Sequence, residues 1–253
     1  MANRVKQAFN ALSPEQQDIV RARRFSGART PDEWLALLGP VAEYDRQADK
    51  LRTEGGGFFE RRYARKTDIP NSLRKFALPL LPILREDMEA DAPLELWVDL
   101  TGPLQSPKAV RHSEPYKKGA YRKVVDTFYD DPWFQSRTRF ADGSQLQFAV
   151  IDHVRSTFKE KRNPRGKIKR KTKNKKKIEM TVTLTVQNRL YAPAGGARDL
   201  PKHKLKPSEK HTKVTVGGTL VAANMDQLPR LESLIELISG AYERVAPARR
   251  KKL

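Results

Sequence analysis

The chain has 253 residues, 38% of them hydrophobic, and a formal net charge of +20 at pH 7. This length suits one large domain or two small ones, and the charge favours polyanionic partners. The absence of cysteine excludes disulfides, zinc–thiolate sites and thiol nucleophiles. Residues 1–10 lack the apolar segment of a signal peptide, and the apolar stretch at 76–84 is too short to span a membrane. We therefore expect a protein of the cytoplasm or another reducing compartment, with no membrane partner.

The first 90 residues carry the signals of helices. Ser13 and Thr30 each precede a proline, which is the pattern of a capped helix start. Apolar residues then recur every three to four positions after Thr30, although Pro40 is expected to break or kink that helix. The glycine run at 55–57 is the best candidate for a linker.

Residues 93–222 show the alternation of β-strands. The clearest strand starts at Ile178 and ends near Val186, with apolar side chains on one face and mostly threonines on the other. Another strand starts at Leu146, after the turn signal Asp142-Gly143. Residues 116–129 are predicted to be helical. Residues 227–244 are predicted to form an amphipathic helix that covers the sheet through Leu231, Leu234, Ile235 and Ile238.

These elements predict an α+β fold. A helical N-terminal block is followed by a mostly antiparallel sheet with helices on one face and a long basic β-hairpin. The expected division is a helical region over residues 1–57 and an α+β domain over residues 58–253, whose hairpin tip comprises residues 159–177.

The hairpin tip reads KEKRNPRGKIKRKTKNKKK and carries a net charge of 12 − 1 = +11, with Glu160 its one acid. Like charges at this density repel, so we expect a mobile, extended arm whose counter-charge comes from a phosphate backbone. The tip holds no aromatic residue, which favours phosphate contact over base stacking. A solvated loop or another acidic partner is the alternative. The residues expected to contact phosphates are Lys159, Lys161, Arg162, Arg165, Lys167, Lys169, Arg170, Lys171, Lys173, Lys175, Lys176 and Lys177.

Two further basic clusters are candidates for nucleic-acid contact. Arg61, Arg62 and Arg65 lie beside three aromatic residues, so this segment could grip a single strand by charge and stacking. The favoured interpretation is that the aromatics, Phe58, Phe59 and Tyr63, pack a junction between helices instead. The second cluster, Lys202, Lys204 and Lys206, would extend the positive surface of the hairpin if its strand lies nearby.

Catalytic signatures are sparse. Asp152 falls on the apolar face of its strand, which would suit a metal-dependent nuclease with Asp99 or Glu179 as a co-ligand. The commoner explanation is a strand end that emerges into solvent. No catalytic residue, metal ligand or cofactor is therefore assigned.

The sequence thus favours a non-enzymatic nucleic-acid-binding subunit of a larger nucleoprotein assembly. RNA is preferred over DNA because no clear DNA-reading helix is present, and protein partners are expected at the helical N-terminal region. The alternatives are a metal-dependent nuclease and a self-assembling shell protein that packages nucleic acid with a basic arm.

Overall fold

The computed structural model describes residues 4–54, 57–194 and 202–248. Its helices are α1 (Arg4–Asn10), α2 (Pro14–Ala22), α3 (Pro31–Glu54), α4 (Phe58–Lys66), α5 (Leu78–Glu86), which follows a π-helical turn (Leu73–Ala77), and α6 (Leu231–Tyr242). Its strands are β1 (Arg24–Arg29), β2 (Leu94–Asp99), β3 (Ala109–His112), β4 (Tyr116–Lys118), β5 (Tyr121–Arg139), β6 (Gln145–Arg162), β7 (Ile168–Gln187), β8 (Tyr191–Pro193), β9 (Lys202–Pro207), β10 (His211–Val221) and β11 (Val245–Pro247).

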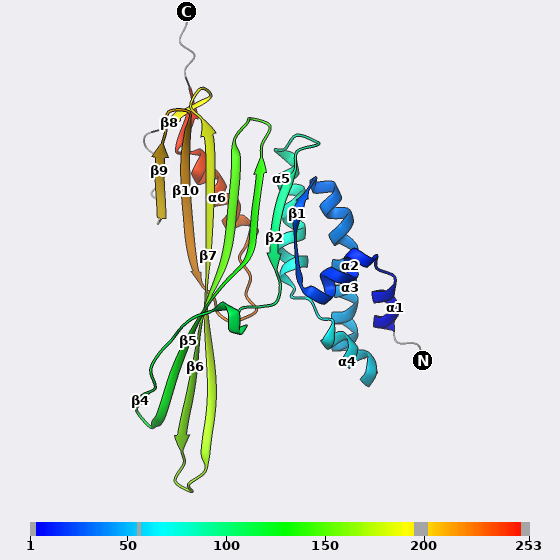
Figure 1. Cartoon of the computed structure of the whole chain (residues 1–253), viewed down its shortest axis with the longest axis vertical. Coiled ribbons are helices and arrows are strands. Elements are labelled where there is room, and N and C mark those ends of the chain that lie inside the picture. Colours follow the sequence, from blue (N-terminus) through cyan, green and yellow to red (C-terminus); the bar gives the residue numbers. More distant parts are fainter. Residues whose placement is uncertain (1–3, 55–56, 195–201, 249–253) are drawn as a thin grey trace, which may run out of the picture.

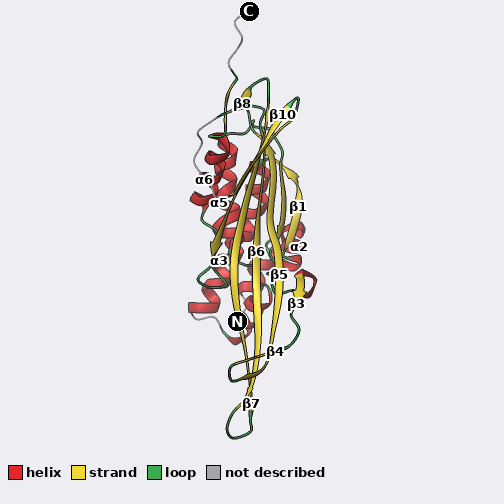
Figure 2. Cartoon of the chain, turned by 90° about the vertical axis from the view of Figure 1, so that its left-hand side faces the viewer, coloured by secondary structure: helices red, strands yellow, loops and turns green. Residues whose placement is uncertain are grey.

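One large antiparallel sheet organises the molecule, in the strand order β1-β2-β5-β6-β7-β10-β9. The helices all cover the same face of this sheet, so the predicted α+β fold is confirmed (Figures 1 and 2). β5, β6 and β7 are much longer than their neighbours. The half of each strand that lies farther from the helices extends beyond the rest of the molecule, and we call these three paired halves the ribbon and the rest of the molecule the body (Figure 1). We call the place where the ribbon leaves the body the waist. β3 and β4 pair with the β5 edge of the ribbon. We call the body-facing surface of the sheet the inner face and the other surface the outer face.

The inner face of β7 carries the predicted apolar side chains. Every second residue from Ile178 to Val186 is buried, and the threonines between them face outward. The turn at Asp142-Gly143 is also confirmed, because Gly143 has a φ of 80° and its N–H bonds the carbonyl of Phe140 at 2.9 Å. These two features set the register of the sheet.

The helix predicted over residues 116–129 is wrong, since this segment forms β4 and most of the ribbon half of β5. Apolar residues occur on both of its faces, Val124 and Phe128 on one and Val125 on the other, so period-two alternation is masked. Its β-branched and aromatic residues suit a strand. Pairing from Lys123 onward with β6 decides the outcome.

The N-terminal helical region is not separate from the sheet. β1 lies inside residues 1–57 and pairs with β2, and one buried cluster extends from Val5 to Val245. The division expected at residue 57 therefore falls within a shared core. α3 also continues through Pro40 to Glu54, so the expected break at that proline does not occur.

α6 packs on β7 and β10 but starts later than predicted, at Leu231. Leu234 and Leu237 are the buried anchors, whereas Ile235 is 42% exposed and does not face the sheet. Leu231 and Ile238 also pack against the core, so the predicted stripe is wrong at Ile235 and lacks Leu237.

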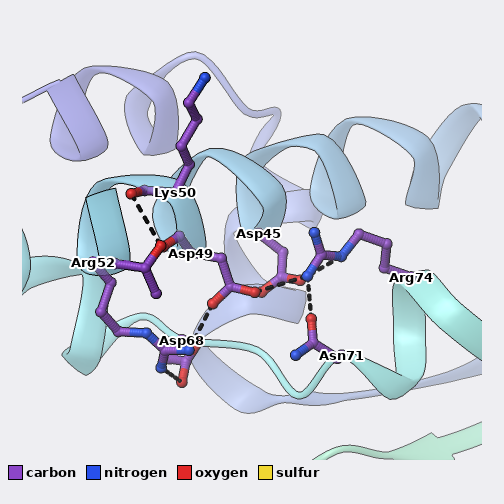
Figure 3. Close-up of polar contacts among 8 residues, drawn as sticks. Asp45, Asp49, Lys50, Arg52, Asp68, Asn71 and Arg74 are labelled. Atoms are coloured by element: carbon purple, nitrogen blue, oxygen red, sulfur yellow. Dashed lines mark hydrogen bonds and ion pairs between the residues drawn. The ribbon is translucent and has the colours of Figure 1, made fainter. Parts of the chain in front are cut away.

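A buried acid connects α3 to the π-helical turn (Figure 3). The side chain of Asp45 is fully buried, and its Oδ2 lies 3.3 Å from Nε of Arg74, which also bonds Asp49 at 2.7 Å. Burial, followed by repulsion from Asp49, raises the pKa of Asp45 to about 7, although Arg74 opposes the rise. Asp68 adds a further like charge.

This carboxyl should make stability fall as pH rises. Between its ordinary pKa of 3.8 and about 7, Asp45 is protonated in the folded chain and ionised in the unfolded chain. Asp45→Asn removes this proton uptake, so the variant should gain stability relative to wild type between pH 4.5 and 7.5. Urea denaturation at both pH values measures the difference. A difference that does not change with pH would contradict the assignment.

Candidate nucleic-acid interface

The hairpin tip, residues 159–177, forms ordered strands and not a long mobile loop. Residues 159–162 end β6 and residues 168–177 begin β7, so only 163–167 form the connecting turn. Asn163 closes this turn, because its Oδ1 accepts from the N–H of Lys167 at 2.8 Å and its carbonyl accepts from Gly166 at 2.9 Å. The expected extended arm is therefore a paired β-ribbon, and its lysines have defined directions.

Strand alternation sorts the charges of β7 by face. Odd-numbered positions point to the outer face and even-numbered positions to the inner face, as the buried residues of the body show. The outer positions of the ribbon half are all lysine and all exposed. They are Lys169, Lys171, Lys173, Lys175 and Lys177, and we call this set the lysine row.

No carboxylate lies within ion-pair distance of the lysine row in the described part of the chain, whereas two cations of the opposite face are paired with acids. Arg170 Nε bonds Glu160 at 2.9 Å, and Lys176 Nζ bonds Asp152 at 3.0 Å. Lys176 is buried, so this one of the expected phosphate contacts is not on the surface. Of the twelve cations, two are thus paired with acids, five form the lysine row, and the other five lie on β6 or in the connecting turn.

Neighbouring strands extend the outer face beside the lysine row. Lys159 and Lys161 of β6 lie over the ring of Tyr121 on β5, with Nζ 5.3 and 5.8 Å from its centroid. Asp126 is buried on the same face and accepts from Arg155 at 2.6 Å. This hydrogen bond to Arg155 is the main reason that the pKa of Asp126 is lowered. Asp126 therefore neutralises an arginine of β6 and forms no ion pair with the lysine row.

A histidine lies at the waist end of the outer face. His153 Nδ1 lies 2.7 Å from Asp130 and its Nε2 lies 3.1 Å from Glu179, so the three side chains bridge β5, β6 and β7. Burial opposes protonation of His153, but the hydrogen bonds to the two acids outweigh it and raise its pKa. The positive row therefore ends at a more acidic zone near the body.

The inner face of the waist borders a polar cavity of about 660 Å³. Asp99, Asp131 and Asp152 line it, and Lys108 lies 3.1 Å from Asp99 and 2.6 Å from Asp131. Burial raises the pKa of Asp131 and of Asp152, while their lysines oppose the rise. Each of these carboxylates is paired with an ammonium group through one oxygen, and Oδ1 of Asp152 is buried without a hydrogen-bond partner.

The structure corrects the acids proposed for a nuclease. Asp152 and Glu179 lie on opposite faces of the sheet, so they cannot share a metal ion. Asp99 does line the same cavity as Asp152. The sequence pattern missed Asp131, which lies directly opposite Asp152 in the pairing of β5 with β6, because the register of this pairing shifts between Asp131 and Phe134. Among residues 4–54, 57–194 and 202–248, no group of three or more His, Asp or Glu could hold a metal ion.

The Lys176–Asp152 pair should be a strong determinant of ribbon stability. Their side chains are 3% and 9% exposed, and Lys176 also donates to the carbonyl of Gln227 at 2.7 Å. Lys176→Met leaves a buried unpaired charge, which costs about 3–5 kcal/mol. In urea denaturation, Asp152→Leu added to this variant should recover most of the loss. Exposed Lys177→Met is the matched control, and an equal loss from it would contradict the role of the pair.

The other predicted basic residues lie elsewhere. Lys204 and Lys206 of β9 share the outer face with the lysine row. Lys204 lies opposite Thr215 of β10, and Thr215 lies opposite the outward-facing Thr183 of β7. β9 is at the opposite end of the long sheet, so the two sets form no compact patch (Figure 1). Lys202 begins β9, and its side chain lies outside the described residues.

Arg61, Arg62 and Arg65 are exposed on α4, in the helical block. The expected packing of the adjacent aromatics holds for Tyr63, which contacts Phe9 edge to face at 6.4 Å. It is wrong for Phe58 and Phe59, which are 68% and 76% exposed. α4 uses Ala64 and Tyr63 against α1 and α3, and this leaves its first residues in solvent.

Comparison with known proteins identifies no relative. No protein-family model, curated protein or solved structure matches this chain. Within the part of the chain that the structure describes, no helix has the length and apolar character of a membrane span.

Proposed function

We propose that the protein binds nucleic acid, with RNA the preferred class, through the lysine row of its ribbon. The observation that carries the proposal is the row itself: five exposed lysines on one strand face without a carboxylate partner among the described residues. Alternate residues of a strand lie about 6.6 Å apart, so the row presents cations along about 26 Å. A strand of duplex nucleic acid carries a phosphate about every 3.4 Å, which is enough to supply a counter-charge for every lysine of the row.

The chemistry of the row favours phosphate contact over base reading. Lysine offers a flexible point charge and not a planar fork, so it follows a phosphate chain without fixed geometry. Two aromatic rings of β5 beside the row are covered by cations of the chain itself, Tyr121 by Lys159 and Lys161 and Phe128 by Arg111 and Arg155. We therefore propose binding that is insensitive to base sequence.

Chemical acetylation of lysines tests this proposal. A bound 20-nucleotide RNA or DNA should protect Lys169, Lys171 and Lys173 from acetylation, as read by mass spectrometry, because phosphates shield the ammonium groups. Buried Lys176 should be unreactive in either state, and exposed Lys50 of α3 should react equally in both. Equal protection of Lys50 and the lysine row would contradict a specific interface, and comparison of the RNA and DNA arms gives the preferred class.

A further inference from the structure

α4 combines exposed aromatic rings with cations on one helical face. At 100° per residue, Ala64 and Tyr63 define the packed side, and Phe58, Arg62 and Arg65 fall on the opposite side. Arg61 and Lys66 flank them, and both are exposed. The helix is held in place by its packing and by Glu60, whose Oε1 lies 3.1 Å from Nε of Arg4.

The charge of this face has no internal partner. None of Arg61, Arg62, Arg65 and Lys66 forms an ion pair within the described residues, and Glu60, the acid of the helix, is engaged by Arg4. A partner of α4 should therefore be negatively charged.

The aromatic pair remains open to a ligand. The rings of Phe58 and Phe59 meet edge to face with centroids 5.5 Å apart, an arrangement that covers a single ring face. Two phenylalanines with most of their surface in solvent are unusual in a protein with a large shared core. An apolar planar partner would bury this surface.

We infer that α4 is a second contact site, which takes unpaired bases of a single-stranded segment. Phe58 or Phe59 stacks on a base, and Arg62 and Arg65 contact the flanking phosphates. An amphipathic membrane helix would separate apolar and cationic residues onto different faces, whereas here Phe58 lies among the cations. The interleaved arrangement therefore favours nucleic acid over a lipid surface.

This inference rests on the proposed function and refines its substrate. In Figure 1, α4 lies at the lower end of the helical block, the end from which the ribbon projects. The lysine row would accept phosphates of paired or unpaired strands, whereas α4 would accept only unpaired bases. The protein should therefore prefer single-stranded segments over a continuous duplex.

Fluorescence anisotropy of the full chain tests the inference with a labelled single strand of 20 nucleotides and its duplex. The double variant Phe58→Ala/Phe59→Ala should weaken single-strand binding at least about fivefold, because one lost base stack is worth about 1–3 kcal/mol. Its duplex affinity should change less than twofold. Phe58→Tyr/Phe59→Tyr keeps both rings and should retain single-strand affinity. Both positions are exposed, so melting temperatures should match wild type.

The outcomes separate this inference from the proposed function. Unchanged single-strand affinity in the alanine double variant would overturn the inference, and the proposed function would stand if alanine at Lys169, Lys171, Lys173 and Lys175 weakens both ligands. Failure of wild type to bind either oligonucleotide at low salt would overturn both. Vesicles with anionic lipid form a third arm, and loss of vesicle binding without loss of oligonucleotide binding would assign α4 to a membrane and overturn the inference.

Discussion

Alanine at Lys169, Lys171, Lys173 and Lys175 should lower nucleic-acid affinity about 10³-fold near 0.1 M salt. Each lysine that neutralises a phosphate releases about one counterion, so four lysines change the slope of log affinity against log salt by about 3–4. Between 1 M salt and 0.1 M salt, this slope corresponds to a change in affinity of about 10³-fold. All four side chains are exposed, so the fold should persist. Filter binding or anisotropy at a fixed salt concentration measures the loss.

A matched variant distinguishes the effect of where the lysines lie from the effect of the total charge of the protein. Alanine at Lys204, Lys206, Lys210 and Lys213 also removes four exposed lysines, giving 20 − 4 = +16 in both variants. These residues lie on β9 and β10 or the turn between them, at the other end of the sheet. We expect less than about a tenfold loss from this control. Equal losses in the two variants would show that total charge alone determines binding.

Val182→Asp should unfold the protein, whereas Thr183→Asp should be mild. Val182 is fully buried in the half of β7 that lies within the body, and a buried carboxylate without a partner costs several kcal/mol, which is comparable to a typical stability of about 5–15 kcal/mol. Thr183 lies on the outer face, with its hydroxyl 3.2 Å from that of Thr215. Thermal unfolding followed by circular dichroism measures both. Similar melting temperatures for the two variants would contradict the face assignment on which the direction of the lysine row depends.

The body of the sheet was predictable because its strands have one apolar and one polar face. Ile178 to Val186 follow this rule without exception, and the structure buries each expected side chain. The ribbon half of β5 lacks the pattern, because both of its faces are partly covered. Val124 is buried on the outer face beside β4, a contact that only the tertiary structure creates.

The charged residues of the hairpin were predictable as a group, but their separate environments were not. The lysine row follows from period-two alternation through 169–177, once the segment is known to be a strand. The burial of Lys176 depends on Asp152 across the strand pair and on the carbonyl of Gln227, which is 51 residues distant. The exposure of Phe58 and Phe59 likewise depends on which face of α4 meets α1 and α3.

The salt dependence of affinity tests the central claim most directly. We expect log Kd for wild type and a 20-nucleotide ligand to rise steeply and linearly with log salt, because phosphate contact releases counterions. Alanine at the four positions Lys169, Lys171, Lys173 and Lys175 should reduce the slope by about 3–4, at about 0.9 per lost contact, and the β9–β10 control should keep the wild-type slope. An unchanged slope in the lysine-row variant would contradict phosphate binding by the ribbon.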